Sequence, residues 1–214
     1  GGFRRRDRQS VSADDPRLVA ARQLAHRQGP IASVLEHMQP EGFWSAPGPG
    51  YLPKYYSTVW SLVLLAQLGA SMYEDARIQQ ACEYFLAHGL TPQGQITASG
   101  APSGTADCMQ GNLCWALLEL GCAPSRLEKA YEWMARSVTG EGMASNQERD
   151  AELRYYAGKC GPLFACGSND KQPCAWGGVK VMLAFSRLPV ELRTPLIQRA
   201  IQHGVDFLFS TDPA

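Results

Sequence analysis

The feature that most constrains this chain is a short helical motif that occurs three times along the sequence. Each copy contains a small residue, any residue, an acid, an aromatic residue and a large apolar residue. The copies span 81–85, 130–134 and 204–208, and each follows a leucine-rich segment, at 65–69, 117–121 and 183–189. Recurrence at irregular spacing is typical of stacked helical hairpins with loop insertions. The alternative interpretation is chance similarity among amphipathic helices.

The hydrophobic pattern predicts helices along most of the chain. Apolar residues in 58–69 recur at helical spacing, and no alternating run is long enough to predict a strand. Gly69, Gly89 and Gly121 follow apolar segments, as glycines that end helices do. We therefore expect an all-α fold, with helices at 16–27, 30–38, 56–69, 74–88, 105–121, 125–138, 174–187 and 190–209.

Charge and hydropathy exclude several classes of partner. The chain has 20 Lys and Arg and 20 Asp and Glu, so no net field attracts nucleic acid. Residues 1–14 carry an arginine cluster and are expected to form a disordered basic tail, with a nucleic-acid arm as the alternative. We expect one domain over 15–214. No run reaches the roughly 20 apolar residues of a membrane span, and no signal peptide is visible, which predicts a cytoplasmic protein.

Cysteines form the constellation with most chemical potential. Seven is an odd number, and a reducing compartment disfavours disulfides, which leaves free thiols or metal ligands. Four cysteines lie at predicted helix starts or in a Gly-rich loop: Cys108, Cys160, Cys166 and Cys174. Zinc binds thiolate sulfur readily, so these residues predict a zinc site. The alternatives are packed or free thiols, and a Cys160–Cys166 disulfide.

The other three cysteines are expected to be structural. Cys82 and Cys114 lie inside predicted helices and read as core residues, whereas Cys122 follows Gly121 and reads as a loop or packing thiol.

Six aromatic residues are candidate walls of a ligand cavity: Trp44, Tyr51, Tyr55, Trp60, Trp115 and Trp176. Aromatic rings hold apolar chains or stabilise cations. The alternative for this set is core packing between helices. Lys54 precedes Tyr55 in a loop and is a candidate ligand of a phosphate or carboxylate, with ordinary surface exposure as the alternative.

Several of these segments together resemble a known repeat family. The turn with Gln39, Glu41, Gly42 and Trp44, the segment 51–60, the segment 107–113 and the segment 173–180 are similar to prenyltransferase/squalene-cyclase-repeat proteins, in particular uncharacterised bacterial members. The resemblance implies an (α/α) toroid, in which inner and outer helices alternate around a central cavity. Such rings normally contain further hairpins, so we expect a fragment of a longer ring, a smaller ring or a ring closed by a partner.

The resemblance also implies a function. We expect a prenyltransferase- or terpene-cyclase-like protein that binds an isoprenoid or other apolar small molecule, with the cysteine-bound zinc at the cavity rim. Asp107 beside Cys108 resembles the family's Asp-x-Cys zinc ligands without the spacer. The Asp-x-Asp-Asp acid of squalene-type cyclases is absent from the sequence, so whether the chain is a transferase, a lyase or no enzyme stays open.

Two alternatives lie outside this class. One is a non-catalytic interaction scaffold with a structural zinc or free thiols, which binds a protein partner or a second copy of itself. The other is a redox-responsive thiol protein, which would require reversible oxidation of Cys160 and Cys166.

Overall fold

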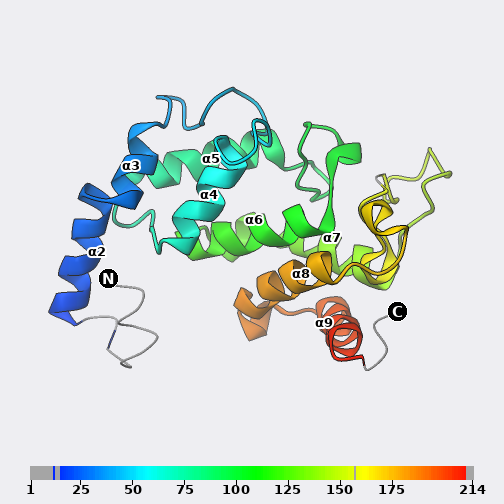
Figure 1. Ribbon diagram of the computed structural model, residues 1–214. Coiled ribbons are helices and arrows are strands. Elements are labelled where there is room, and N and C mark those ends of the chain that lie inside the picture. Colours follow the sequence, from blue (N-terminus) through cyan, green and yellow to red (C-terminus); the bar gives the residue numbers. More distant parts are fainter. Residues whose placement is uncertain (1–11, 13–14, 157, 211–214) are drawn as a thin grey trace.

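The computed structural model describes residues 12, 15–156 and 158–210, and this part of the chain is all-helical (Figure 1). Apart from isolated bridges, it contains no β-structure in the described residues, so the all-α prediction is confirmed. The expected basic tail at 1–14 lies outside the described residues, Ser12 excepted. The helices are α2 (Pro16–Arg27), α3 (Pro30–Glu36), α4 (Thr58–Gln67), α5 (Ala76–Gly89), α6 (Asp107–Leu120), α7 (Glu128–Thr139), α8 (Ala175–Arg187) and α9 (Pro195–Leu208).

Some helix ends follow the capping rules that the sequence suggested, and one does not. Asp75 caps α5 by accepting a hydrogen bond from the Arg77 N–H at 2.9 Å, and Gly121 ends α6 in the left-handed conformation at φ 108°. Gly89 was expected to end α5 in the same way, and this prediction is wrong. The chain leaves α5 extended at Leu90, and Gly89 lacks a side chain because a Cβ there would lie 2.6 Å from the Phe85 ring.

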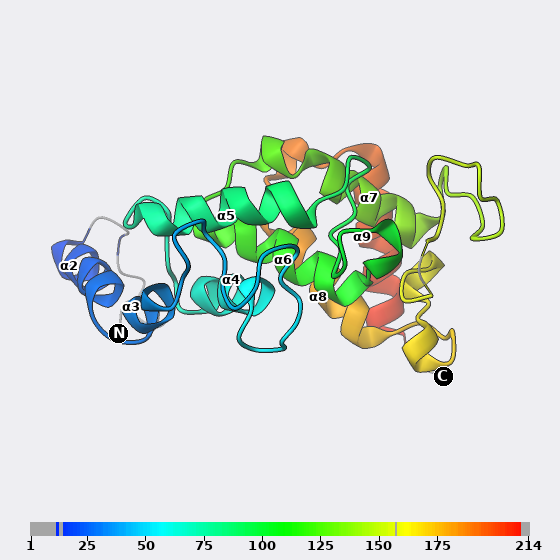
Figure 2. The ribbon, with the colours of Figure 1, turned by 90° about the horizontal axis from the view of Figure 1, so that it is seen from above.

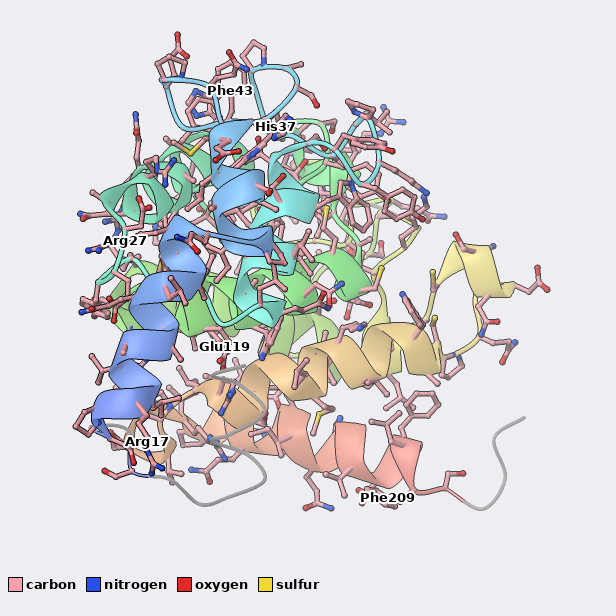
Figure 3. The ribbon with its side chains drawn as sticks, turned by 60° about the vertical axis from the view of Figure 1, so that its left-hand side comes forward. Arg17, Arg27, His37, Phe43, Glu119 and Phe209 are labelled. Atoms are coloured by element: carbon pink, nitrogen blue, oxygen red, sulfur yellow. The ribbon has the colours of Figure 1, made fainter. Side chains whose placement is uncertain are left out.

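The hairpins stack so that alternate helices touch. α6 packs between α4 and α8, and α7 packs against α9 (Figures 1 and 2). Glycine permits the closest approach, since a Cβ on Gly111 of α6 would lie 2.4 Å from the backbone of Lys180 in α8. At the far end of the same pair, Glu119 of α6 forms an ion pair with Arg187 of α8 (Figure 3).

Equivalent contacts recur in successive hairpins, which gives the repeat a physical basis. The Trp44 N–H donates to the Thr58 hydroxyl at 3.1 Å, and the Ile96 N–H donates to the Gln110 side-chain oxygen at 2.6 Å. Thr58 and Gln110 lie at the starts of α4 and α6, and each bonds the loop that precedes its helix. The same contact between a loop and the helix that follows it therefore occurs in two successive hairpins.

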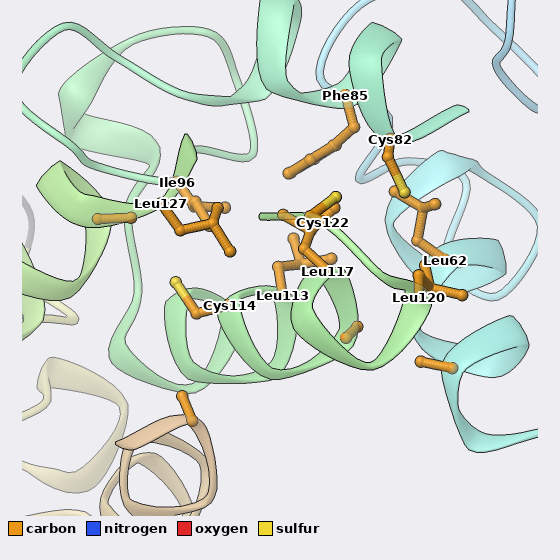
Figure 4. Packing of buried hydrophobic residues seen from close by; sticks show 14 of the residues in the cluster. Leu62, Cys82, Phe85, Ile96, Leu113, Cys114, Leu117, Leu120, Cys122 and Leu127 are labelled. Carbon is orange, nitrogen blue, oxygen red and sulfur yellow. The ribbon is translucent and has the colours of Figure 1, made fainter. Parts of the chain in front are cut away.

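The core lies between the row of α4, α6 and α8 and the helices that alternate with it, α5, α7 and α9 (Figure 4). Leu62, Phe85, Leu113 and Leu117 are fully buried there. Each such side chain contributes roughly 1.5–3 kcal/mol on burial. The buried Tyr131 hydroxyl of α7 donates to the α8 backbone at 3.0 Å, so its polar atom is satisfied inside the core. No helix in the described part of the chain has the length and hydrophobicity needed to cross a membrane.

Candidate metal centre

The first turn of α6 carries a buried carboxyl group. Asp107 is 5% exposed, and its Oδ1 accepts a hydrogen bond from the Ser137 hydroxyl of α7 at 3.4 Å. Burial raises the pKa of Asp107 to about 7, although the Cys160 thiol, Ser137 and the Gly161 N–H act in the opposite direction. No donor meets hydrogen-bond geometry at Oδ2. The carboxylate is therefore buried without full compensation of its charge.

Close packing brings the starts of α6 and α8 together. A Cβ on Gly177 would lie 3.3 Å from the Asp107 Cβ and 3.9 Å from the Cys108 nitrogen. Cys108 is the second residue of α6, and Cys174 is the N-cap residue of α8. Two of the predicted metal ligands are thus neighbours because their helices begin side by side.

The loop before α8 supplies the other two cysteines. Cys160 is buried, and the preceding Lys159 carbonyl accepts a hydrogen bond from the Asp107 N–H at 3.3 Å. The Cys166 carbonyl accepts from the backbone N–H groups of Asn169 and Lys171 at 2.8 and 2.9 Å, which closes a tight turn. The Cys174 N–H donates to Phe164 at 3.0 Å, so the loop folds back from Cys166 to the start of α8.

This loop contains backbone conformations that L-residues rarely adopt. Positive φ angles occur at Leu163 (50°), Phe164 (63°), Asp170 (51°) and Lys171 (63°). Each such conformation costs about 1–3 kcal/mol, so the surrounding contacts must hold it. One such contact is the fully buried Phe164 ring, whose centroid lies 5.7 Å from that of Phe207 in α9.

Electrostatic coupling links the four thiols. Burial raises the pKa of Cys108, and the charges of Asp107, Cys166 and Cys174 raise it further. Burial likewise raises the pKa of Cys160 well above its usual value, with added contributions from Asp107, Cys108 and Cys166. The structure therefore brings the sequence-predicted ligands and Asp107 into one cluster, the thiol cluster. All seven cysteines are free thiols.

The donor chemistry of the thiol cluster suits zinc, but its side chains do not converge on one point. Among the described residues, no three His, Cys, Asp or Glu side chains are arranged to hold a metal ion. Zinc needs its sulfur ligands at about 2.3 Å in a tetrahedron. Binding would therefore require side-chain rotations at the ends of α6 and α8 and in the loop 158–174.

Two residues that sequence reasoning missed support this region. The Tyr155 hydroxyl donates to the Ser137 carbonyl at 2.9 Å, and the Ser137 hydroxyl reaches Asp107. Burial, Asp107 and Cys160 all raise the pKa of Tyr155. Neither residue lies in a motif, and both are far from Asp107 in sequence, so only the packing of α7 on α6 reveals them.

A groove of about 870 Å³ lies beside the thiol cluster. Leu163, Asp170 and Pro173 of the loop form one part of its lining, and His203 and Phe207 of α9 form another. The loop that carries the cysteines thus forms part of a surface large enough for a small molecule.

The predicted cavity aromatics occupy different environments. The ring of Trp60 in α4 contacts those of Tyr51 and Tyr55 at tilted angles, with centroids 5.5 and 5.2 Å away, and the Lys54 Nζ lies 5.9 Å from the Tyr51 ring centroid. These residues form a small aromatic group before and within α4.

Trp44 and Tyr55 line a second groove, of about 490 Å³. Trp44 is buried, and its Nε1 donates to the Val34 carbonyl at 2.8 Å. Trp115 is half-buried on α6, whereas Trp176 on α8 is 67% exposed and contacts Lys180 by a cation–π interaction at 5.0 Å. The six aromatics therefore extend along the row of α4, α6 and α8 and the loops before α4.

Comparison with known proteins yields no family model, no curated protein and no solved structure that matches this chain.

Proposed function

We propose that this chain is a prenyltransferase/squalene-cyclase-like repeat protein that holds a structural zinc ion through Cys108, Cys160, Cys166 and Cys174. The proposal is carried by one observation: beside the buried Asp107, the charges of Cys166 and Cys174 raise the pKa of Cys108, and those of Cys108 and Cys166 raise the pKa of Cys160. Four protein thiolates leave no open coordination position, which favours a structural over a catalytic metal.

The direction of these pKa shifts favours a bound cation. Burial and the charge of Asp107 are the two largest influences on the pKa of Cys108 and of Cys160, and both oppose ionisation of these thiols. A bound cation would reverse this, because zinc deprotonates its cysteine ligands and their attraction to the metal replaces their repulsion. Zinc binding would also hold the left-handed residues of the loop. A reducing compartment such as the cytoplasm would keep the thiols available.

The proposed ligand is an isoprenoid or another apolar small molecule. Its support comes from apolar side chains left exposed on the row of α4, α6 and α8: Leu64 is 42%, Trp176 67% and Val179 50% exposed. In an (α/α) toroid this row would form the inner wall of the cavity. An apolar chain would bury this surface at about 25 cal/mol per Å².

Zinc content measured on protein purified under reducing conditions tests the metal. We expect about one zinc per chain, lost in Cys108→Ser and Cys174→Ser as well as in Cys160→Ser and Cys166→Ser. Cys114→Ser is the matched control, because Cys114 is buried elsewhere on α6 and should retain the metal. Wild-type protein without zinc, never exposed to a chelator, would contradict the proposal.

Quenching of tryptophan fluorescence by farnesol and farnesyl diphosphate tests the ligand. Trp176→Ala should weaken binding, whereas substitution of Trp133, which is buried in α7, should leave the affinity unchanged if the fold is retained. Preference for the diphosphate over the alcohol would implicate a cation such as Lys54. No saturable quenching by either compound would remove the ligand proposal while leaving the zinc result intact.

A protein-binding scaffold is the second candidate. Trp176, Val179 and Leu183 form an exposed apolar stripe at helical spacing on α8, which a partner helix could also cover. Stoichiometric zinc without isoprenoid binding would favour this function.

A further inference from the structure

A second pair of thiols lies apart from the thiol cluster. Cys82 is on α5, and Cys122 is in the turn after α6. Figure 4 shows both side chains in the same part of the core, near Leu62 and Leu117. Each thiol is near enough to shift the pKa of the other. Two free thiols from segments far apart in sequence thus lie in the same part of the core.

The surrounding residues hold these two segments together. Arg126, four residues after Cys122, donates two hydrogen bonds to the carboxylate of Glu83, the residue next to Cys82, at 2.9 and 2.7 Å. This bidentate ion pair fixes the turn against α5. Cys122 follows the left-handed Gly121 in an irregular segment, whose backbone adjusts more easily than a helix, so its sulfur has freedom to approach Cys82.

The two thiols are chemically unequal. The interaction between them lowers the pKa of Cys122 and raises that of Cys82; the Arg126 charge also lowers the pKa of Cys122, although burial and Glu83 act in the opposite direction. Cys122 is 8% exposed and Cys82 is 1% exposed. Cys122 therefore has both the greater thiolate character and the greater access, which are the two properties that govern thiol oxidation.

We propose that Cys82 and Cys122 form an oxidative modification site, at which a peroxide joins the two thiols in a disulfide that links α5 to the turn after α6. The Cys122 thiolate attacks one oxygen of hydrogen peroxide and becomes a sulfenic acid, and the released hydroxide takes up the thiol proton as water. The Cys82 sulfur then displaces the sulfenic hydroxyl, which leaves with the Cys82 proton as a second water. Two thiols lose two electrons, and one peroxide is reduced to two waters.

Peptide mapping without reduction tests this site. Cleavage after glutamate releases peptides 75–83 and 120–128, each of which carries one cysteine of the pair. After limited peroxide treatment we expect one joined peptide, two hydrogen masses lighter than the sum of the two. A thiol reductant should separate it again. Both peptides recovered unlinked, or a sulfenic acid that accumulates on Cys122 while Cys82 stays free, would overturn the proposal.

Variants and thermal unfolding provide the controls. Cys122→Ser, at the edge of the core, should abolish the joined peptide, and Cys114→Ser should retain it. The disulfide should raise the Tm of oxidised wild type by several degrees, because it constrains the unfolded chain between α5 and α6. An equal rise in Cys122→Ser would show that another modification is responsible and would overturn the assignment. Neither experiment requires zinc or an isoprenoid, so the result is separable from the proposed function.

Discussion

Two loops occupy corresponding places before neighbouring helices, yet they are held in different ways. The loop 90–106, before α6, is fixed by the chain's own hydrogen bonds: the Gln110 amide donates to the Gly94 carbonyl at 2.8 Å, and its oxygen accepts from Ile96. Its left-handed residues are Gly94 and Gly100. The loop 158–174, before α8, has left-handed residues with side chains, and the fourth residue of α8 is Gly178 where that of α6 is Gln110.

This difference between the loops suggests which group holds each of them in place. In the loop 90–106, the buried Gln110 side chain supplies hydrogen bonds to backbone groups that would otherwise have no partner. In the second, no side chain of that kind extends from the start of α8, and three cysteines and the adjoining Asp107 lie there instead. We infer that a metal replaces the glutamine as the group that organises the loop.

The largest effect is expected at Asp107 in zinc-free protein. Because burial raises its pKa to about 7, the folded state binds a proton that the unfolded state releases near pH 4. Stability should therefore fall as pH rises from 4 to 7 and level off above that range. Asp107→Asn removes this titration, so its unfolding free energy relative to wild type should rise by on the order of 4 kcal/mol across that window.

Urea unfolding at several pH values, with a chelator present, measures this difference. Ser125→Ala, in the turn before α7, is the control and should follow the wild-type pH dependence. A constant difference between Asp107→Asn and wild type would show that the carboxyl group titrates normally in the folded protein.

The next effect concerns the first loop. Gln110→Ala removes hydrogen bonds to Ile96, Gly94 and the Ala130 carbonyl, all in the core. It should cost about 3 kcal/mol, because buried backbone groups lose their partners. Asn112→Ala, half-buried on the same helix, should cost far less. Since this loop needs no metal, the stability lost on substitution should be the same with and without zinc. A loss that depends on zinc would contradict the difference between the two loops.

A smaller effect is expected where α6 meets α8. Alanine at Gly111 gains about 1 kcal/mol of helix propensity, but its Cβ would lie 2.4 Å from the Lys180 backbone. The net cost should be about 2 kcal/mol, and zinc affinity should fall because the helix starts separate. Gly158→Ala, where a Cβ meets nothing within 4 Å, is the matched control. Equal stability of the two variants in thermal unfolding would contradict the close packing.

Sequence reasoning predicted the helices better than the contacts of the site. Apolar periodicity located α2 through α9 because each helix buries one face, whereas the equivalent contacts of Thr58 and Gln110 lie outside the repeated motif. The proximity of Cys108 to Cys174 was anticipated only through the expectation that inner helices begin at one rim. Ser137 and Tyr155 could not be predicted, because their role depends on how α7 packs. Gly89 was misread because its packing against Phe85, rather than a positive φ, explains the glycine.

Amide hydrogen exchange with and without zinc tests the difference between the two loops most directly. The experiment compares exchange in 90–106 and in 158–174 of reduced wild-type protein, with Cys166→Ser as the variant that should lose the metal. We expect zinc to slow exchange in 158–174 by at least tenfold, to leave 90–106 unchanged, and to have no effect in the variant. Equal exchange of 158–174 with and without zinc would contradict the inference that a metal organises this loop.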